Sequence, residues 1–187
     1  HEDAAEAMRA VRYLRRRETL RTAMGWTLGI VDIEDTCAGL AAIDECTIGA
    51  ALQIALRELQ AAPESAEPAE AAEPAEAEET AGEKLLTRIA VIGMGRLGGA
   101  ENGFGSDADV MFVHEPLDGA DEDAAQEQAA RIVNRTLALL KQPVKPAIRA
   151  ERPLEVDADL RPEGKQGAIV RSLDSYRSYY ERWAETW

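Results

Sequence analysis

The stretch GFGSDADV, residues 103–110, places two aspartates one residue apart at the beginning of a predicted strand. On a strand, residues i and i+2 point to the same side, so Asp107 and Asp109 can aim both carboxylates at one point. Two unit charges ~4 Å apart repel by about 4 kcal/mol at an effective dielectric constant near 20. A divalent cation such as Mg²⁺, which prefers oxygen ligands, would offset that repulsion. The alternative is that Asp107 caps a turn and Asp109 is solvated.

A third carboxylate is predicted on another strand, LEVDADL, at residues 154–160, where apolar and acidic residues alternate. Asp157 lies on the acidic side of this strand, together with Glu155 and Asp159. We therefore take Asp157 as the candidate third metal ligand. The predicted apolar side consists of Leu154, Val156, Ala158 and Leu160.

Residues suited to binding phosphate flank these carboxylates. Gly105 and Ser106 precede the aspartate pair and can offer backbone N–H groups and a hydroxyl to a polyphosphate. Arg161 and Lys165 follow the third carboxylate in a glycine-containing turn. Carboxylates and phosphate-binding groups in this order are typical of metal-assisted nucleotidyl transfer, in which metals stabilise the entering and leaving oxygens of an in-line displacement.

The glycines before this stretch suggest a different class of protein. GMGRLGG contains a formal G-x-G-x-x-G at Gly93, Gly95 and Gly98, directly after a predicted strand, as in dinucleotide-binding turns. That motif requires a helix to begin inside it, but Asn102 and Gly103 follow too soon for a long helix. The acidic residue expected about 20 positions later is also missing. A dinucleotide-dependent oxidoreductase, which would bind NADH and need no magnesium, is therefore the less favoured interpretation.

The charge of the chain is unevenly distributed. Of the net charge of −14, eight negative charges come from glutamates in residues 61–83, which contain no basic residue, so the remainder carries −6. This balance argues against a general nucleic-acid binder, which needs a basic surface. The first predicted helix is rich in arginine, but glutamates are mixed in, which indicates a solvated face or a domain contact.

The cysteines and the apolar runs bear on location. Cys37 and Cys46 lie nine residues apart in a predicted helix, roughly 13 Å along its axis, which is too far for a disulfide. Two reduced thiols suit a cytoplasmic protein. The longest uninterrupted apolar runs are far shorter than the roughly 20 residues of a membrane span, so we expect no membrane partner.

Periodicity predicts helices at 2–24, 33–60 and 121–141, with Asp32 capping the second, and strands at 88–95 and 109–114. After the third strand, at 154–160, AIVRS is extended, and Ser172 caps a final helix. Three regions follow: an N-terminal helical segment at 1–60, an Ala/Pro/Glu-rich linker or insertion at 61–84, and a catalytic core at 85–187. The aromatic stripe of the final helix is predicted to lie in the core and consists of Tyr176, Tyr180, Trp183 and Trp187.

Two long stretches resemble the glutamine synthetase adenylyltransferase family: IAVIGMGRLGGAENGFGSDADVMFVHEP at 89–116 and VDADLRPEGKQGAIVRSLDSYRSYYERWAETW at 156–187. The lead-in YLRRRETLRTAMGWTLGI is similar as well. The resemblance implies an α+β fold, with a polymerase-β-like nucleotidyltransferase sheet, flanking helices and an N-terminal helical segment. It implies Mg²⁺, ATP as substrate, glutamine synthetase as partner, and a nitrogen-signalling regulatory protein.

In that family, one long chain carries two such domains: one attaches AMP to a tyrosine of glutamine synthetase, and the other removes it by phosphorolysis. By resemblance, Asp107 and Asp109 would be the metal-binding pair, and Asp157 would bind metal and take a proton from the attacking oxygen. Gly105 and Ser106 would hold the phosphates. The sequence departs from the family pattern at Asn102, where an apolar residue is common, and at Asp159, where arginine or another residue is common.

We expect the adenylylating, C-terminal copy, because His114 after the second strand and the phrase VDADLRP resemble that copy. Two alternatives remain open. One is the deadenylylating half of the same enzyme. The other is a nucleotide-binding regulatory domain that has lost catalysis, although such a domain would need no third carboxylate.

Overall fold

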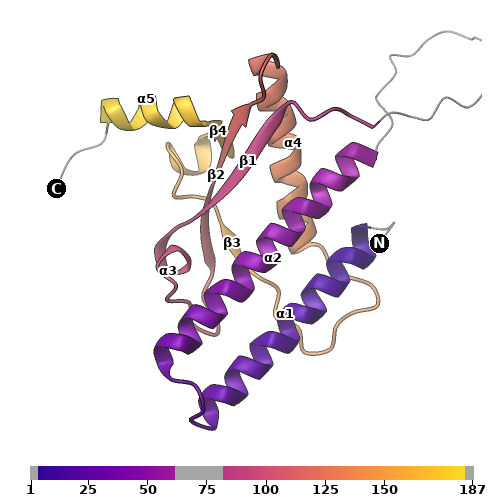
Figure 1. Ribbon diagram of the computed structural model, residues 1–187, viewed down its shortest axis with the longest axis vertical. Coiled ribbons are helices and arrows are strands. Elements are labelled where there is room, and N and C mark those ends of the chain that lie inside the picture. Colours follow the sequence, from indigo (N-terminus) through magenta and orange to yellow (C-terminus); the bar gives the residue numbers. More distant parts are fainter. Residues whose placement is uncertain (1–3, 62–81, 184–187) are drawn as a thin grey trace, which may run out of the picture.

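The computed structural model describes residues 4–61 and 82–183 and combines helices with a four-stranded mixed sheet (Figure 1). A pair of long helices precedes the sheet, as the sequence predicts. The α+β class and the N-terminal helical segment are therefore confirmed.

The two long N-terminal helices, α1 (Ala4–Thr27) and α2 (Ile33–Ala61), lie side by side as a hairpin (Figure 1). Asp32 caps α2 as predicted, since its Oδ1 accepts from the backbone N–H of Asp35 at 2.8 Å. Helix α1 continues through Gly25 to Thr27, whereas the sequence predicted that it ends at Met24. A glycine costs a helix only about 1 kcal/mol, and the carbonyl of Gly25 accepts from Ile30 as the helix ends.

The sheet is built around one central strand. β2 (Ala108–Pro116) pairs antiparallel with β1 (Thr87–Gly93) and parallel with both β3 (Val156–Asp157) and β4 (Val170–Ser172). β3 pairs with the first two residues of β2, and β4 pairs with its middle. The short helix α3 (Gly95–Gly98) lies in the connection between β1 and β2. The beginning of β2 is thus flanked by β3 and by this connection.

Helix α4 (Glu122–Lys141) joins the sheet to the helical hairpin. It begins at the N-cap Asp121, whose side chain accepts from the N–H of Ala124 at 2.9 Å. It contacts β1, β2 and β4 and also α2, so it lies between the sheet and the hairpin. The core that these elements share includes Ile48, Leu52, Phe112, Ile132, Val133 and Leu140.

The composition of α2 is accounted for by this packing. By length and composition alone, α2 is long and apolar enough to cross a membrane. Its buried residues, however, face α1, α4 and α3, and they include the charged residue Asp44. We therefore assign α2 to the core of this fold.

The final helix, α5 (Leu173–Trp183), begins at Ser172, whose Oγ accepts from the N–H of Ser175 at 3.2 Å, as predicted. Tyr176 is buried, and burial raises the pKa of its hydroxyl. The predicted core position of Tyr180 and Trp183 is wrong, because their exposed fractions are 44% and 61%. The helix leads away from the sheet (Figure 1), and the hydroxyl of Tyr180 reaches Sδ of Met111 only at 4.0 Å. Trp187 lies outside the described residues.

The predicted strand at 154–160 is only two residues long in the structure. Its pairing ends at Asp157, after which the chain turns and Leu160 is exposed rather than buried. The turn is stabilised from within, since the N–H of Asp159 donates to Oδ1 of Asp157 at 2.7 Å. The alternation of apolar and acidic residues continues to Leu160, but β2 pairs with this segment only at Val156 and Asp157, so the predicted strand is too long.

Most of the predicted linker at 61–84 lies outside the described residues. Its last two residues, Glu83 and Lys84, are described and contact α4 through the buried Gln128. The amide of Gln128 donates to Glu83 Oε1 at 3.0 Å and to the Lys84 carbonyl at 2.9 Å. It also accepts from the N–H of Leu86 at 2.8 Å. One buried side chain thus directs the chain into β1.

We expect Gln128→Leu to lower the free energy of unfolding by about 1–3 kcal/mol, because it leaves the Leu86 N–H and the Lys84 carbonyl without their partner. The measurement is urea unfolding. The matched control is Glu127→Leu at the adjacent exposed position, which should change stability by less than about 0.5 kcal/mol. Equal effects of the two substitutions would contradict the assignment.

Candidate metal and nucleotide site

Three aspartates converge at the beginning of β2. The parallel register pairs Asp109 of β2 with Asp157 of β3, and Asp107 lies two residues before Asp109. One carboxylate oxygen from each residue lies within 4.8 Å of one from each of the others, and all three side chains are half-buried. This geometry confirms that the three predicted carboxylates come together, and their use as metal ligands stays a prediction.

The protein itself offsets little of the charge on this acidic triad, Asp107, Asp109 and Asp157. Among residues 4–61 and 82–183, the one ion pair to the triad joins Arg96 Nη2 to Asp107 Oδ1 at 3.4 Å. Both side chains of that pair are about half exposed, so it contributes little in solution. Three carboxylates so close together, with only oxygen ligands to offer, fit a hard divalent cation such as Mg²⁺.

The glycines of GMGRLGG let the backbone approach the triad closely. Gly95 has φ +50°, and a Cβ added there would lie 2.4 Å from Asp109 Oδ2. A Cβ at Gly98 would lie 2.4 Å from the carbonyl oxygen of Gly93. The N–H of Met94 donates to the Asp109 carbonyl at 2.8 Å, which fixes the backbone of that aspartate. The absence of side chains at these glycines therefore lets Asp109 pack against the connection between β1 and β2.

The same geometry contradicts the dinucleotide-binding alternative. That fold needs a parallel β-α-β unit whose helix begins in the motif. Here β1 and β2 are antiparallel, and α3 has only four residues. The G-x-G-x-x-G pattern thus arises from close backbone packing.

The predicted phosphate loop, residues 103–106, is closed by its own hydrogen bonds. Ser106 Oγ accepts from the N–H of Gly103 at 2.9 Å, and the N–H of Ser106 donates to the Gly103 carbonyl at 3.2 Å. The Ser106 hydroxyl proton remains available to a ligand oxygen. Gly105 is held under Arg152, because a Cβ on Gly105 would lie 2.6 Å from Nη1 of that arginine.

Arg161 and Lys165 have different surroundings. The Arg161 guanidinium donates to three carbonyls of the turn between β3 and β4, those of Ala158, Lys165 and Gly167. Its side chain is largely buried, so it holds the turn in shape. Lys165 is 82% exposed, and its Nζ lies 3.3 Å from Asp159 Oδ2. Phosphate binding by either residue stays a prediction, and Lys165 is the freer of the two to turn toward a ligand.

Asp159 has a partner set of its own. Its carboxylate pairs with Arg161 at 3.3 Å and with Lys165 at 3.3 Å, and it lies outside the acidic triad. The departure from the family pattern at this position therefore places the extra negative charge against two cations of the turn.

A polar cavity of about 390 Å³ lies beside the triad, within the size range of small-molecule sites. Its lining includes Asp107, Asp157, Arg161 and Lys141, the last residue of α4. Sequence reasoning missed Lys141, because a lysine in the last turn of a helix is expected from the helix dipole alone.

A larger, mainly apolar cavity of about 780 Å³ lies between the sheet and α5. Its lining includes Ile92, Met111, Tyr176 and Tyr180 and none of the predicted site residues. The larger cavity is therefore not the one beside the acidic triad.

The whole chain, residues 1–187, matches the family model of glutamate-ammonia ligase adenylyltransferase. The chain belongs to this family. The helices and the mixed sheet agree with the nucleotidyltransferase fold of its members, so the predicted fold and the predicted family are both confirmed.

Curated relatives in this family are bifunctional glutamine synthetase adenylyltransferase/adenylyl-removing enzymes. The chain is 42% identical to the enzyme from Corynebacterium efficiens over 187 residues, which is 100% of the chain and 16% of that enzyme. It is 43% identical to the Mycolicibacterium smegmatis enzyme over 185 residues, 99% of the chain and 16% of that enzyme. It is 42% identical to the Mycobacterium avium enzyme over 187 residues, which is 100% of the chain and 17% of that enzyme. The chain thus spans about one sixth of the length of these relatives.

We expect Asp109→Asn to raise the stability of the metal-free protein by about 1–4 kcal/mol, because it relieves like-charge repulsion, and to abolish stabilisation by Mg²⁺. Thermal unfolding with and without saturating Mg²⁺ measures both effects. The control is Asp118→Asn in the exposed turn after β2, which should keep the response of the unmodified protein. A full Mg²⁺ response in Asp109→Asn would disprove the metal assignment.

Gly95→Ala should displace the Asp109 carboxylate and weaken metal binding by about tenfold, the size typical of changes just outside the ligand shell. Binding of Mn²⁺, followed by electron paramagnetic resonance, reports the affinity. Gly49→Ala is the control, because a Cβ there meets no atom within 4 Å. Unchanged Mn²⁺ affinity in Gly95→Ala would show that the close approach does not shape the site.

Proposed function

We propose that this chain is a metal-dependent nucleotidyltransferase domain that transfers AMP from ATP to a tyrosine of glutamine synthetase. The observation that carries the proposal is the convergence of Asp107, Asp109 and Asp157 within 4.8 Å, next to a polar cavity. Family membership and the names of the relatives supply the chemical class and the protein substrate. We propose the cytoplasm as its location. We propose a nitrogen-signalling regulatory protein as its second partner.

The three aspartates would hold Mg²⁺, which supplies charge neutralisation for the phosphate oxygens in this class of reaction. The N–H of Gly105 and the Ser106 hydroxyl would contact the phosphates, since the N–H of Ser106 already donates to the Gly103 carbonyl. Lys141, which lines the cavity, adds a cation. The site thus combines anionic ligands for a cation with donors for a polyphosphate.

Asp157 has the additional role of general base. A tyrosine hydroxyl has a pKa of about 10 and must lose its proton as it attacks. Oδ1 of Asp157 accepts from the N–H of Asp159 at 2.7 Å, which orients the carboxylate and leaves the other oxygen for a proton. In the transfer, the tyrosine oxygen bonds to the α-phosphorus, the bond from that phosphorus to the β-phosphate bridging oxygen breaks, and pyrophosphate leaves.

The assignment to the adenylylating copy rests on sequence resemblance. His114, one of the residues behind it, is buried within the sheet, with Nδ1 3.0 Å from Thr87 Oγ1 and Nε2 2.9 Å from Gln126 Oε1. Both ring nitrogens thus have partners within the protein. His114 therefore bears on the assignment only as a resemblance to the adenylylating copy, and it takes no part in the proposed chemistry.

The decisive assay supplies the complete protein with unmodified glutamine synthetase, Mg²⁺ and ATP labelled at the α-phosphate. We expect label on the synthetase, and a loss of at least about a hundredfold in Asp157→Asn, because the base is removed. Asp159→Asn is the matched control two residues away and should retain most of the activity.

The other outcomes assign the alternatives. Loss of labelled ADP release from adenylylated synthetase and phosphate in Asp109→Asn, with attachment retained, would identify the deadenylylating half. In that half, Asp157→Asn should lower the rate of AMP removal less than Asp109→Asn does, because phosphate needs no base at neutral pH. Retention of both reactions in Asp109→Asn and in Asp157→Asn would identify a regulatory domain that has lost catalysis.

A further inference from the structure

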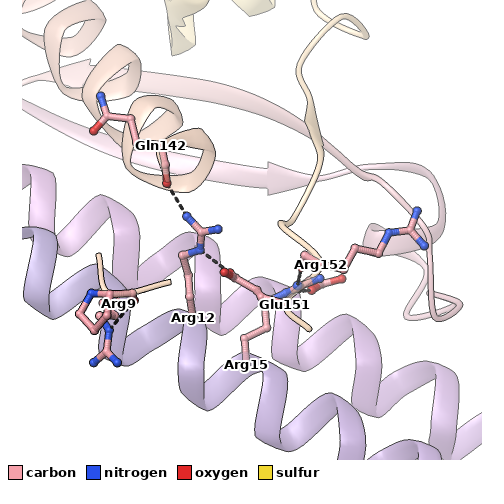
Figure 2. Close-up of polar contacts among 8 residues, drawn as sticks. Arg9, Arg12, Arg15, Gln142, Glu151 and Arg152 are labelled. Carbon is pink, nitrogen blue, oxygen red and sulfur yellow. Dashed lines mark hydrogen bonds and ion pairs between the residues drawn. The ribbon is translucent and has the colours of Figure 1, made fainter. Parts of the chain in front are cut away.

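Three arginines of α1, Arg9, Arg12 and Arg15, bond to the connection between α4 and β3 (Figure 2). Arg12 is 5% exposed; its Nη1 donates to the Gln142 carbonyl at 2.5 Å, and its Nε pairs with Glu151. Arg9 Nε donates to the Pro146 carbonyl at 3.0 Å. Of the two roles that the sequence indicated for these arginines, these contacts support a packing contact rather than a solvated face.

Arg15 makes contacts in two directions. Its Nε donates to Asp44 Oδ1 of α2 at 2.9 Å, and its Nη1 donates to the Arg152 carbonyl at 2.8 Å. The other oxygen of Asp44 accepts from Asn102 Nδ2 at 3.0 Å. Asp44 is 6% exposed and Asn102 is fully buried. Arg15 thus joins α1, α2, the end of the β1–β2 connection and the segment before β3.

The two ends of this network lie beside the two halves of the nucleotide site. Asn102 directly precedes the loop at 103–106, which leads into Asp107. Arg152 lies five residues before Asp157, and its guanidinium lies over Gly105. The network therefore connects the strand segments that carry the two sides of the acidic triad.

Asn102 shows that this link has a cost. Its Oδ1 is buried and has no hydrogen-bond partner within the part of the chain that the structure describes. An apolar residue, which the family pattern favours here, would avoid that cost but could not bind Asp44. A buried ion pair is a poor source of stability by itself, and its better-attested use is to fix one arrangement of the chain.

We propose that Arg15 is a positioning residue of the nucleotide site, which, through Asp44–Asn102 and the Arg152 carbonyl, sets the placement of the 103–106 loop relative to the strand that carries Asp157. The proposal rests on the proposed function. It explains why the arginine is held between four segments that are distant in the sequence, and it names a site determinant more than 80 residues from the loop it positions.

The test compares Arg15→Gln, Asp44→Asn and the double variant in the complete protein, with Arg17→Gln as control. Arg17 lies on the same helix, loses the same charge, and pairs only with its exposed-side neighbour Glu18 among the described residues. We expect Arg15→Gln to raise the KM for MgATP about tenfold with a smaller change in kcat, because the loop loses its placement. Arg17→Gln should leave both constants unchanged.

The double variant separates positioning from stability. Each single variant leaves one buried charge without its partner, whereas the double variant leaves none, so its melting temperature should recover toward that of the unmodified protein. Its KM should remain raised, because the bond to the Arg152 carbonyl is still missing. A KM that recovers together with the melting temperature would overturn the proposal.

Hydrogen exchange gives a readout that needs no activity. The amides of Gly103 and Ser106 should exchange about tenfold faster in Arg15→Gln and at the unmodified rate in Arg17→Gln. If Arg15→Gln does not fold, Asn102→Leu, which leaves the Arg15–Asp44 pair in place, should still accelerate exchange at Gly103. Unchanged exchange would refute the positioning role. Failure of the unmodified protein to bind MgATP would refute the proposed function instead.

Discussion

Electrostatic repulsion among three carboxylates is the constraint around which this fold is arranged. Asp107, Asp109 and Asp157 lie within 4.8 Å of one another, and a single exposed arginine is the only ion-pair partner recorded for them in the described residues. Such a cluster persists only where the surrounding structure prevents the carboxylates from moving apart. Two strands and a glycine-rich connection provide that restraint.

The restraint comes from short backbone distances more than from side-chain charge. The parallel pairing of β2 with β3 sets Asp109 beside Asp157, and Gly95 lies so close to the Asp109 carboxylate that a Cβ there would collide with it. The N–H of Asp159 then holds Asp157 from the other side. These contacts place Asp109 and Asp157 before any ligand binds, which is the preorganisation that a metal site requires.

Positive charge is distributed in two roles. Arg12, Arg15 and Arg161 are largely buried and spend their donors on carbonyls and carboxylates of the fold. Lys165 is exposed and Lys141 lines the polar cavity, so both can reach an anionic ligand. This division follows from chemistry, since a planar guanidinium can satisfy several acceptors at once, whereas a flexible ammonium suits a mobile ligand.

The sequence alone determined the features that depend on neighbours in the chain. The same-side placement of Asp107 and Asp109, the caps Asp32 and Ser172, and the family could all be read from local patterns. The tertiary structure alone decided the features that depend on distant partners. The register of β3 on β2 set where its strand ends, left Leu160 exposed and sent Asp159 to the turn.

The same distinction explains the arginines and the aromatic residues. Arg15 reads as a surface residue in an amphipathic helix, and only the approach of Asp44 and of the segment before β3 makes it a buried link. Trp183 reads as core, but α5 leads away from the sheet and the Trp183 ring is exposed. The physical reason is that helical and strand periodicity record which side of an element is apolar, whereas contacts between elements depend on packing and register that no local pattern encodes.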